Sequence, residues 1–251
     1  MRILIVKLSS IGDVIHAMPA VALIRRSLPS TRITWVVNSR AGAILRDSPV
    51  IDELVEITSR KRGRELGNVA VRGLGGELTD RLRGGASEPP DIAIDLQGLV
   101  KSGFVAYRSG AKRRVGFESS DLRESVSRIF LTEQVKTCHI PHVIEKNLEL
   151  VRASLDVKAD PARYEFPIVV SPEDERYVER ALEGDDRFAI VNPGGGWPTK
   201  LWSTERFGPL ADWLLAEYEM KSLITFGPGE EQLAEAVASG SRARAARPFA
   251  S

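Results

Sequence analysis

A short polar loop follows the first apolar run of the sequence and holds residue types that acid–base chemistry uses. Residues 9–13 read Ser-Ser-Ile-Gly-Asp, and they separate a predicted strand at 2–8 from a predicted helix at 14–28. Ser10 and Gly12 precede the helix, where a ligand can approach the backbone and its free N–H groups. Asp13 suits two roles, which are a general base facing a cleft and a cap of its own helix.

A second loop, at 95–102, follows another apolar run and supplies Gln97 and Lys101. In doubly wound sheets, ligands bind at loops that leave the carboxyl ends of strands, so we expect this loop beside the first. An ordinary strand-to-helix turn is the alternative interpretation. Two basic segments suit either an acidic, phosphorylated substrate or solvated loops, and their candidate residues are Arg60, Arg62, Arg64 and Arg114.

Two loops in the C-terminal part of the sequence suit a nucleotide. The loop 192–200 is rich in glycine, so its backbone N–H groups can reach phosphate oxygens, and a lysine ends it. Its candidate residues are Gly194, Gly195, Gly196, Thr199 and Lys200. The loop 227–231 ends in Glu230 and Glu231. These carboxylates can hold ribose hydroxyls, or they can simply complement the dipole of the next helix.

Three other classes of site lack their sequence signals. The spacing of a P-loop is absent, and so is a GxGxxG motif followed by an acidic residue about 20 positions later. A nicotinamide-dependent dehydrogenase is therefore disfavoured. His139 and His142 have no evident third ligand, so we expect no metal site and no cofactor.

The composition excludes further classes of protein. The chain has 251 residues, is 43% hydrophobic and carries a formal net charge of +1, which argues against disorder and against a nucleic-acid binder that relies on positive charge. Its one cysteine excludes an internal disulfide framework. Charged residues interrupt every N-terminal apolar stretch, so we predict no membrane-spanning helix. We expect a cytoplasmic protein, which can touch the surface of a membrane.

Strands alternate with helices along the chain, which predicts an α/β fold with mostly parallel sheets. The predicted domains are 1–160, a connecting segment at 161–184, and a shorter unit at 185–251 that is half the size of a usual domain. The tail at 239–251 is rich in arginine and alanine, and we predict no strand there.

Three stretches carry a resemblance to a known family. They read MRILIVKLSSIGDVIHAMPA, IDLQGLVKS and NPGGGWPTKLWSTERFGPLADWL. The chain resembles glycosyltransferase family 9 from Met1 to about Ala238. The residues of the first two stretches favour type I lipopolysaccharide heptosyltransferases over type II. The resemblance implies a GT-B architecture of two Rossmann-like domains, the second incomplete here. It also implies inverting, metal-independent transfer of L-glycero-D-manno-heptose from ADP-heptose to Kdo of the lipopolysaccharide inner core.

The resemblance assigns a role to each candidate residue. Asp13 matches the general base, and Lys200 matches the lysine that neutralises the departing diphosphate. Glu230 or Glu231 matches the carboxylate on the adenosine ribose, and the other donor-binding candidates are Ser10, Gly12, Gly194, Gly195, Gly196 and Thr199. The candidates for binding an anionic acceptor, Kdo-lipid A, are Arg60, Arg62, Arg64, Gln97, Lys101 and Arg114.

One family element is missing from the sequence. No Asp-x-Gly-x-x-His segment occurs, and His142 is the last histidine. We therefore expect a truncated donor domain, from a frameshift or an incomplete gene, and an impaired enzyme. The alternatives are a non-catalytic fragment that binds only the acceptor and a family member of type II.

Overall fold

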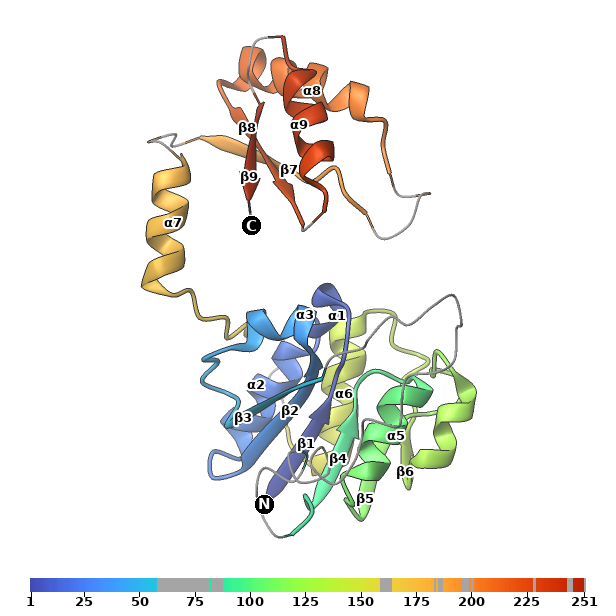
Figure 1. Cartoon of the computed structure of the whole chain (residues 1–251). Helices are drawn as coiled ribbons and strands as arrows, with labels where there is room; N and C mark the ends of the chain where they lie inside the picture. Colours follow the sequence, from blue (N-terminus) through green and yellow to red (C-terminus); the bar gives the residue numbers. More distant parts are fainter. Residues whose placement is uncertain are drawn as a thin grey trace. The chain divides into compact units, whose positions relative to one another are not determined.

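The structure is a computed structural model, and it describes residues 1–57, 82, 88–158, 164–182, 184, 187–195, 199, 201–227, 229–242 and 246–250. The chain divides into two compact units, Met1–Val169 and Val170–Ser251 (Figure 1). The sequence also predicts a weak helix near Gly76–Leu82, and this segment lies outside the described residues, apart from Leu82, which is buried.

The N-terminal unit is built on a six-stranded parallel sheet. Its strands occur in the order β3-β2-β1-β4-β5-β6, which is the order of a doubly wound fold. Their bounds are β1 Arg2–Val6, β2 Arg32–Asn38, β3 Glu53–Ile57, β4 Ile92–Asp95, β5 Arg113–Phe117 and β6 Glu133–Val135. The central strand β1 is apolar on both faces because helices cover both faces of the sheet.

Helices pack on the two faces of this sheet (Figure 1). Helices α2 (Met18–Ser27) and α6 (Val143–Leu155) share a core with Ile3 and Ile5 of β1. Helix α5 (Val100–Arg108) packs on the other side, with Leu4 and Val6. The alternation of β1 side chains between these two cores explains why the run is continuously apolar.

The helix expected at 14–28 is broken in the structure. Helix α1 (Ile11–Ile15) ends before α2 begins, and Pro19 is the second residue of α2. Because Pro19 falls inside the predicted helix, the sequence also predicts an irregular first turn, and the break confirms it. In the structure Pro19 lies in the first turn of α2, where backbone N–H groups have no partner within the helix, so the N–H that proline lacks is not needed.

Several short elements were not predicted. They are α3 (Ser39–Gly42), the 3₁₀ helices η1 (Ala43–Leu45) and η3 (Ser125–Phe130), and β6. Strand β6 is three residues long, Glu-Gln-Val, so it has no apolar run that could have marked it.

The C-terminal unit has a three-stranded parallel sheet of order β7-β8-β9. Its elements are α7 Pro172–Leu182, β7 Phe188–Val191, α8 Thr204–Tyr218, β8 Lys221–Phe226, α9 Glu231–Ser239 and β9 Ala246–Ala250. The apolar runs and helical periodicity of residues 173–238 predict all of these elements except β9. Between α8 and α9 the backbones approach closely, since a Cβ added to Gly208 would lie 2.2 Å from the carbonyl carbon of Gly240.

The expectation of a tail without a strand was wrong. Strand β9 pairs with β8 over five residues, from Ser222↔Ala246 to Phe226↔Ala250. Pairing along β8 satisfies backbone groups whatever the side chains are, and Pro248 is tolerated because β9 lies at the edge of the sheet. Within the described parts of the chain, no helix is long and apolar enough to cross a membrane.

Candidate functional site

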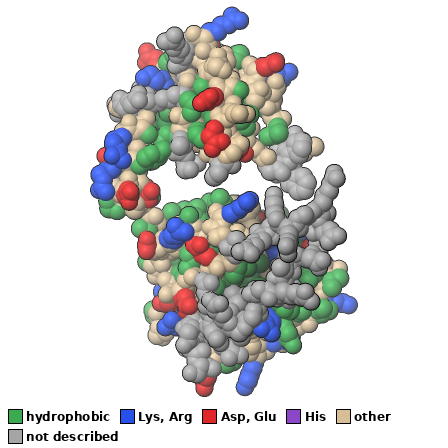
Figure 2. Space-filling view, in the orientation of Figure 1, with side chains coloured by type: hydrophobic (Ala, Val, Ile, Leu, Met, Phe, Trp, Pro, Cys, Tyr) green, Lys and Arg blue, Asp and Glu red, His purple; other side chains and the backbone are tan. Residues whose placement is uncertain are grey.

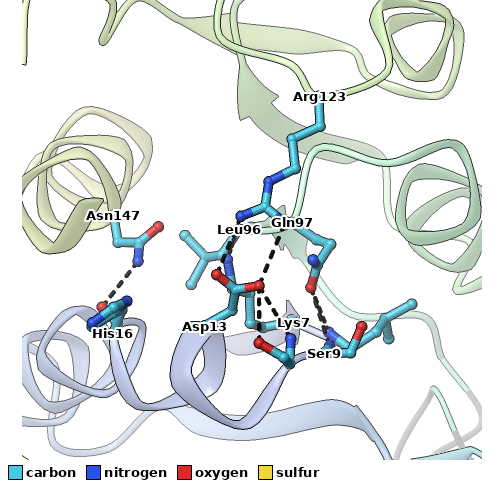
Figure 3. Close-up of polar contacts among 10 residues, drawn as sticks. Lys7, Ser9, Asp13, His16, Leu96, Gln97, Arg123 and Asn147 are labelled. Carbon is cyan, nitrogen blue, oxygen red and sulfur yellow. Dashed lines mark hydrogen bonds and ion pairs between the residues drawn. The ribbon is translucent and has the colours of Figure 1, made fainter. Parts of the chain in front are cut away.

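The loops after β1 and β4 are held together at the carboxyl edge of the N-terminal sheet. The side-chain oxygen of Gln97 accepts hydrogen bonds from the backbone N–H groups of Leu8, at 3.0 Å, and Ser9, at 3.2 Å (Figure 3). This contact follows from topology, because β1 and β4 are neighbours and both loops leave the same edge. The structure thus brings the first two predicted loops together.

Asp13 lies in the first turn of α1, and its carboxylate contacts two residues, Ser10 and Arg123 (Figure 3). Its Oδ2 accepts a hydrogen bond from the backbone N–H of Ser10 at 3.1 Å, which is the capping role foreseen from the sequence. The guanidinium of Arg123 lies 3.2 Å from Oδ1, although 110 residues separate the two. The Asp13 side chain is 19% exposed and that of Arg123 is 57% exposed.

The surroundings keep this carboxylate ionised. Burial acts to raise the pKa of Asp13, but the Ser10 N–H and the positive charges of Lys7 and Arg123 outweigh it, so the pKa lies below its ordinary value. An ionised, partly exposed carboxylate can accept a proton from a hydroxyl of a ligand. Capping and general-base catalysis are therefore compatible at this position.

Arg123 reaches Asp13 because its neighbour anchors the segment between β5 and η3. The backbone N–H of Glu124 donates to the carbonyl of Gly98 at 3.2 Å, and the Glu124 carboxylate accepts from the N–H of Val100 at 2.7 Å. Sequence reasoning missed Arg123, since nothing local in the sequence marks a contact over this separation.

Lys7, directly after β1, was also missed by sequence reasoning. Its side chain is buried, and Nζ donates to the carbonyl of Leu96 at 2.5 Å. Burial lowers the pKa of Lys7 to about 8, although Asp13 and Asp95 act to raise it. In the sequence, Lys7 stands inside an apolar run and reads as an interruption of a strand rather than as part of a site.

Asp95, the last residue of β4, holds the turn that presents Gln97. It accepts hydrogen bonds from the N–H groups of Gln97, at 2.9 Å, and Gly98, at 3.2 Å, and from the hydroxyl of Ser102 at 2.9 Å. Burial raises the pKa of Asp95 to about 6, and the hydrogen bonds oppose that rise. Gly98 has φ +72°, which a residue with a side chain rarely adopts.

A hollow of about 570 Å³ opens at the loop that precedes Asp13, although Asp13 is not among its lining residues. Of the predicted residues, it includes Ser10, Gly12 and Lys101, and a Cβ added to Gly12 would meet no atom within 4 Å. Its lining contains two basic side chains and no carboxylate, and consists of Ser9, Ser10, Ile11, Gly12, Asn38, Arg40, Ala41 and Lys101. Figure 2 shows Lys and Arg side chains on this unit over α1 and α3. The hollow suits an anionic, hydroxyl-bearing ligand.

The structure does not bring Arg114 to this edge. Arg114 is the second residue of β5 and pairs with the second residue of β4, so it lies near the amino end of the sheet. Its Nε donates to the carbonyl of Phe130 at 2.6 Å and its Nη1 to that of Ala111 at 2.7 Å. Arg60, Arg62 and Arg64 lie outside the described residues.

A second hollow, of about 420 Å³, lies in the C-terminal unit at the carboxyl ends of β7 and β8. Its lining contains Gly194, Gly195 and Glu230 of the predicted set. The Glu230 carboxylate accepts from the N–H of Gly227 at 3.0 Å. A Cβ at Gly194 would lie 2.8 Å from Glu230 Oε2, so a side chain at this position would displace the Glu230 carboxylate.

The remaining donor-binding candidates are placed differently. Glu231 begins α9, accepts from the N–H of Gly229 at 3.1 Å and is not among the lining residues of the second hollow. Thr199 is exposed, while Gly196 and Lys200 lie outside the described residues. Among the residues that the structure describes, no three His, Cys, Asp or Glu side chains gather as metal ligands would.

Comparison with known proteins gives a consistent set of relatives. The sequence model of Glycosyltransferase family 9 (heptosyltransferase) matches residues 80–246. Lipopolysaccharide heptosyltransferase 1 of Pseudomonas aeruginosa is 26% identical over 215 residues, which are 84% of this chain and 57% of that protein. The protein of the same name from Escherichia coli K12 is 24% identical over 241 residues, 96% of this chain and 73% of its own length. The chain thus spans little more than half of the Pseudomonas relative.

Solved structures show the same fold. E. coli heptosyltransferase WaaC with ADP matches with a TM-score of 0.76 and 22% identity, covering 99% of this chain and 74% of that one. E. coli ADP-heptose lps heptosyltransferase II matches with a TM-score of 0.72 and 18% identity, covering 100% and 72%. The α/β class of GT-B type expected from the sequence is confirmed.

Proposed function

Because the chain belongs to glycosyltransferase family 9 (heptosyltransferase), we propose that it transfers L-glycero-D-manno-heptose from ADP-heptose to Kdo of the lipopolysaccharide inner core. The observation that carries the proposal is Asp13, an ionised and partly exposed carboxylate that directly follows the segment Ser9–Gly12, which lines an open hollow with basic walls. The proposed reaction inverts the anomeric centre and needs no metal ion.

In the proposed mechanism, Asp13 is the general base. A hydroxyl oxygen of the acceptor forms a bond to C1 of the heptose while the bond from C1 to the diphosphate oxygen breaks. The hydroxyl proton passes to the Asp13 carboxylate as this displacement proceeds. The low pKa of Asp13 keeps it ready to accept the proton at neutral pH.

The C-terminal unit is proposed to bind the ADP part of the donor. The Glu230 carboxylate lines the second hollow, where it can accept hydrogen bonds from the ribose hydroxyls. Gly194 and Gly195 line the same hollow and have no side chain to keep phosphate oxygens away from the backbone. Lys200 is proposed to neutralise the charge that develops on the departing diphosphate.

The N-terminal unit is proposed to bind the acceptor. Lys101 lines the hollow of the N-terminal unit, and Gln97 holds the loop that forms part of its wall. Further proposed contacts for an anionic acceptor are Arg60, Arg62 and Arg64. Arg114 is not proposed as an acceptor contact, because its guanidinium donates hydrogen bonds to carbonyl groups of its own unit. We propose that the enzyme is cytoplasmic and that it meets an acceptor of the Kdo-lipid A type at the cytoplasmic face of the inner membrane.

Product analysis tests the proposal. The chain is incubated with ADP-heptose and Kdo-lipid A, and the mass and anomeric configuration of the product are determined. Addition of one heptose with inverted configuration, in the presence of a metal chelator, is expected. Transfer only to an acceptor that already carries a heptose would assign the type II reaction, and acceptor binding without ADP binding would identify a non-catalytic module.

A further inference from the structure

A short helix of the N-terminal unit exposes two large apolar side chains. Among the described residues, three large apolar side chains are more than 60% exposed, and Val126, at 61%, and Ile129, at 67%, are two of them. Both belong to η3, a 3₁₀ helix, in which residues three apart lie on the same side. Val126 and Ile129 therefore form one apolar row on the outer side of η3.

A second row of η3 packs on α5 and fixes this orientation (Figure 1). Ser127 is fully buried, and the ring of Phe130 lies 5.8 Å from that of Phe104, edge to face. A Cβ added to Gly103 of α5 would lie 3.1 Å from Cδ2 of Phe130 and 3.2 Å from the carbonyl oxygen of Ser127, so η3 lies directly on the backbone of α5. The apolar row cannot turn inward without breaking this contact.

The exposed apolar surface continues onto the end of α5. Tyr107 is 54% exposed, and its ring lies 6.1 Å from that of Phe130, the residue after Ile129. The guanidinium of Arg114 lies over the same ring, 5.6 Å from its centre. A tyrosine beside aliphatic side chains is typical of the boundary between lipid headgroups and acyl chains.

Positive charge borders this surface, although the whole chain carries a formal net charge of only +1. Residues 100–131 contain seven lysines and arginines but only three acidic residues. Arg128 of η3 is exposed, and so is Lys112 in the loop after α5; neither forms an ion pair with any residue that the structure describes. Apolar side chains bordered by cations match an anionic lipid bilayer, whereas a nucleic acid offers no apolar phase for the aliphatic row.

We propose that the outer side of η3 and the end of α5 dock on an anionic phospholipid bilayer. Val126, Ile129 and Tyr107 enter the boundary between headgroups and acyl chains, and Arg128 and Lys112 bind lipid phosphates. The chain then lies on the bilayer and does not span it. This inference goes beyond the proposed function, because it names the docking surface and its lipid and holds even without transfer.

The same segment connects the apolar row to the candidate site. Arg123, whose guanidinium binds Asp13, stands three residues before Val126. Three residues of chain span at most about 11 Å. A bilayer at η3 therefore lies near the loop that holds Asp13, where an acceptor anchored by acyl chains presents its hydroxyl. Only this last step rests on the proposed function.

Co-sedimentation of the full chain with vesicles tests the docking surface. The chain should bind vesicles that contain phosphatidylglycerol more tightly than vesicles of phosphatidylcholine alone, and added salt should weaken binding. The double variant Val126→Ser and Ile129→Ser should bind about tenfold or more weakly, because less apolar surface leaves water. Arg128→Gln should bind about fivefold more weakly. Wild-type binding by the double variant, or no binding by the unaltered chain, overturns the proposal.

The matched control for these variants is Ile190→Ser. Ile190 is also 67% exposed, but it lies on β7 of the C-terminal unit. This variant should bind the vesicles as the unaltered chain does. An equal loss of binding in Ile190→Ser would show that exposed apolar area in general, and not the row on η3, drives binding, which overturns the proposal.

A label at position 129 tests which surface meets the lipid. Cys138 is the one cysteine, so Ile129→Cys combined with Cys138→Ser carries a single polarity-sensitive fluorophore. Its emission should shift to shorter wavelength on vesicles, whereas the same label at Ile190→Cys should not shift. Vesicle binding with unchanged emission at position 129 overturns the proposal. A dimer in sedimentation velocity that the double variant abolishes assigns the row to a second copy and also overturns it.

Transfer assays distinguish this inference from the proposed function. The double variant should transfer heptose at the wild-type rate to an acceptor without acyl chains, but more slowly to an acceptor held in vesicles. Wild-type rates on both acceptors, with unchanged vesicle binding, overturn the docking surface alone. Vesicle binding through the labelled surface without any transfer overturns the proposed function alone.

Discussion

The buried lysine makes the stability of the N-terminal unit depend on pH in a predictable direction. Folding lowers the pKa of Lys7 from 10.5 to about 8, so between these values the unfolded chain binds a proton that the folded chain does not. Stability therefore rises with pH through this window. The difference corresponds to about 3 kcal/mol, and burial of the side chain leaves little solvent screening to reduce it.

Lys7→Met should abolish that rise. Urea unfolding of the wild type and the variant is measured at a series of pH values from about 7 to about 11, and the two free energies of unfolding are subtracted at each pH. Trp35 reports on the N-terminal unit because it is fully buried and donates a hydrogen bond to the Lys7 carbonyl at 3.2 Å. Trp202 and Trp213 of the C-terminal unit are exposed and already emit from water.

The matched control is Lys112→Met, which removes a lysine that is exposed on the same unit. This variant should retain the wild-type dependence of stability on pH. The free energy of unfolding of the wild type minus that of Lys7→Met should change between pH 8 and pH 10.5. A constant value over this range would show that folding does not destabilise the charged form of Lys7.

Three further predictions concern other parts of the chain. Gly208→Ala should destabilise the C-terminal unit by about 1–3 kcal/mol, because its Cβ would meet the backbone of Gly240, and an unchanged melting temperature would refute the close approach. Glu230→Gln should weaken ADP binding about tenfold or more in calorimetry, since a hydrogen bond to a charged group is lost, and an equal Kd would remove Glu230 from the site. Folding lowers the pKa of Asp52, although burial opposes this, because the N–H of Ile33 and the guanidinium of Arg25 bind its carboxylate. The wild type should therefore lose stability as pH falls through that pKa, and Asp52→Asn should lose less, as measured by urea unfolding in acid; parallel curves would contradict it.

Local sequence signals were sufficient for most of the fold. The run at 2–8 predicted a buried parallel strand because only such a strand is apolar on both faces, and the structure places β1 at the centre of its sheet. The helices α6 and α8 followed from the spacing of their apolar residues. Strand β9 was not foreseen, because its pairing depends on the neighbouring β8 rather than on its own side chains.

The candidate site was only partly predictable. Gly12 and Asp13 lie at the start of the helix after β1, and Gln97 lies in the loop after β4, so the rule for doubly wound sheets located them. The contact between Arg123 and Asp13 spans 110 residues and depends on the path of the segment after β5. Arg114 was predicted to bind the acceptor but lies near the amino end of its strand, away from the candidate site. A cluster of basic residues in the sequence does not indicate which end of a strand each residue occupies.

The central claim is that Asp13 acts as a base and not only as a helix cap, and Asp13→Asn tests it most directly. Asparagine can still accept the hydrogen bond from the Ser10 N–H, but it cannot take a proton. In this variant, kcat for heptose transfer should fall about 10²–10⁴-fold, while the Kd for ADP and the unfolding midpoint stay close to those of the wild type. Transfer at the wild-type rate by a folded Asp13→Asn chain would contradict it.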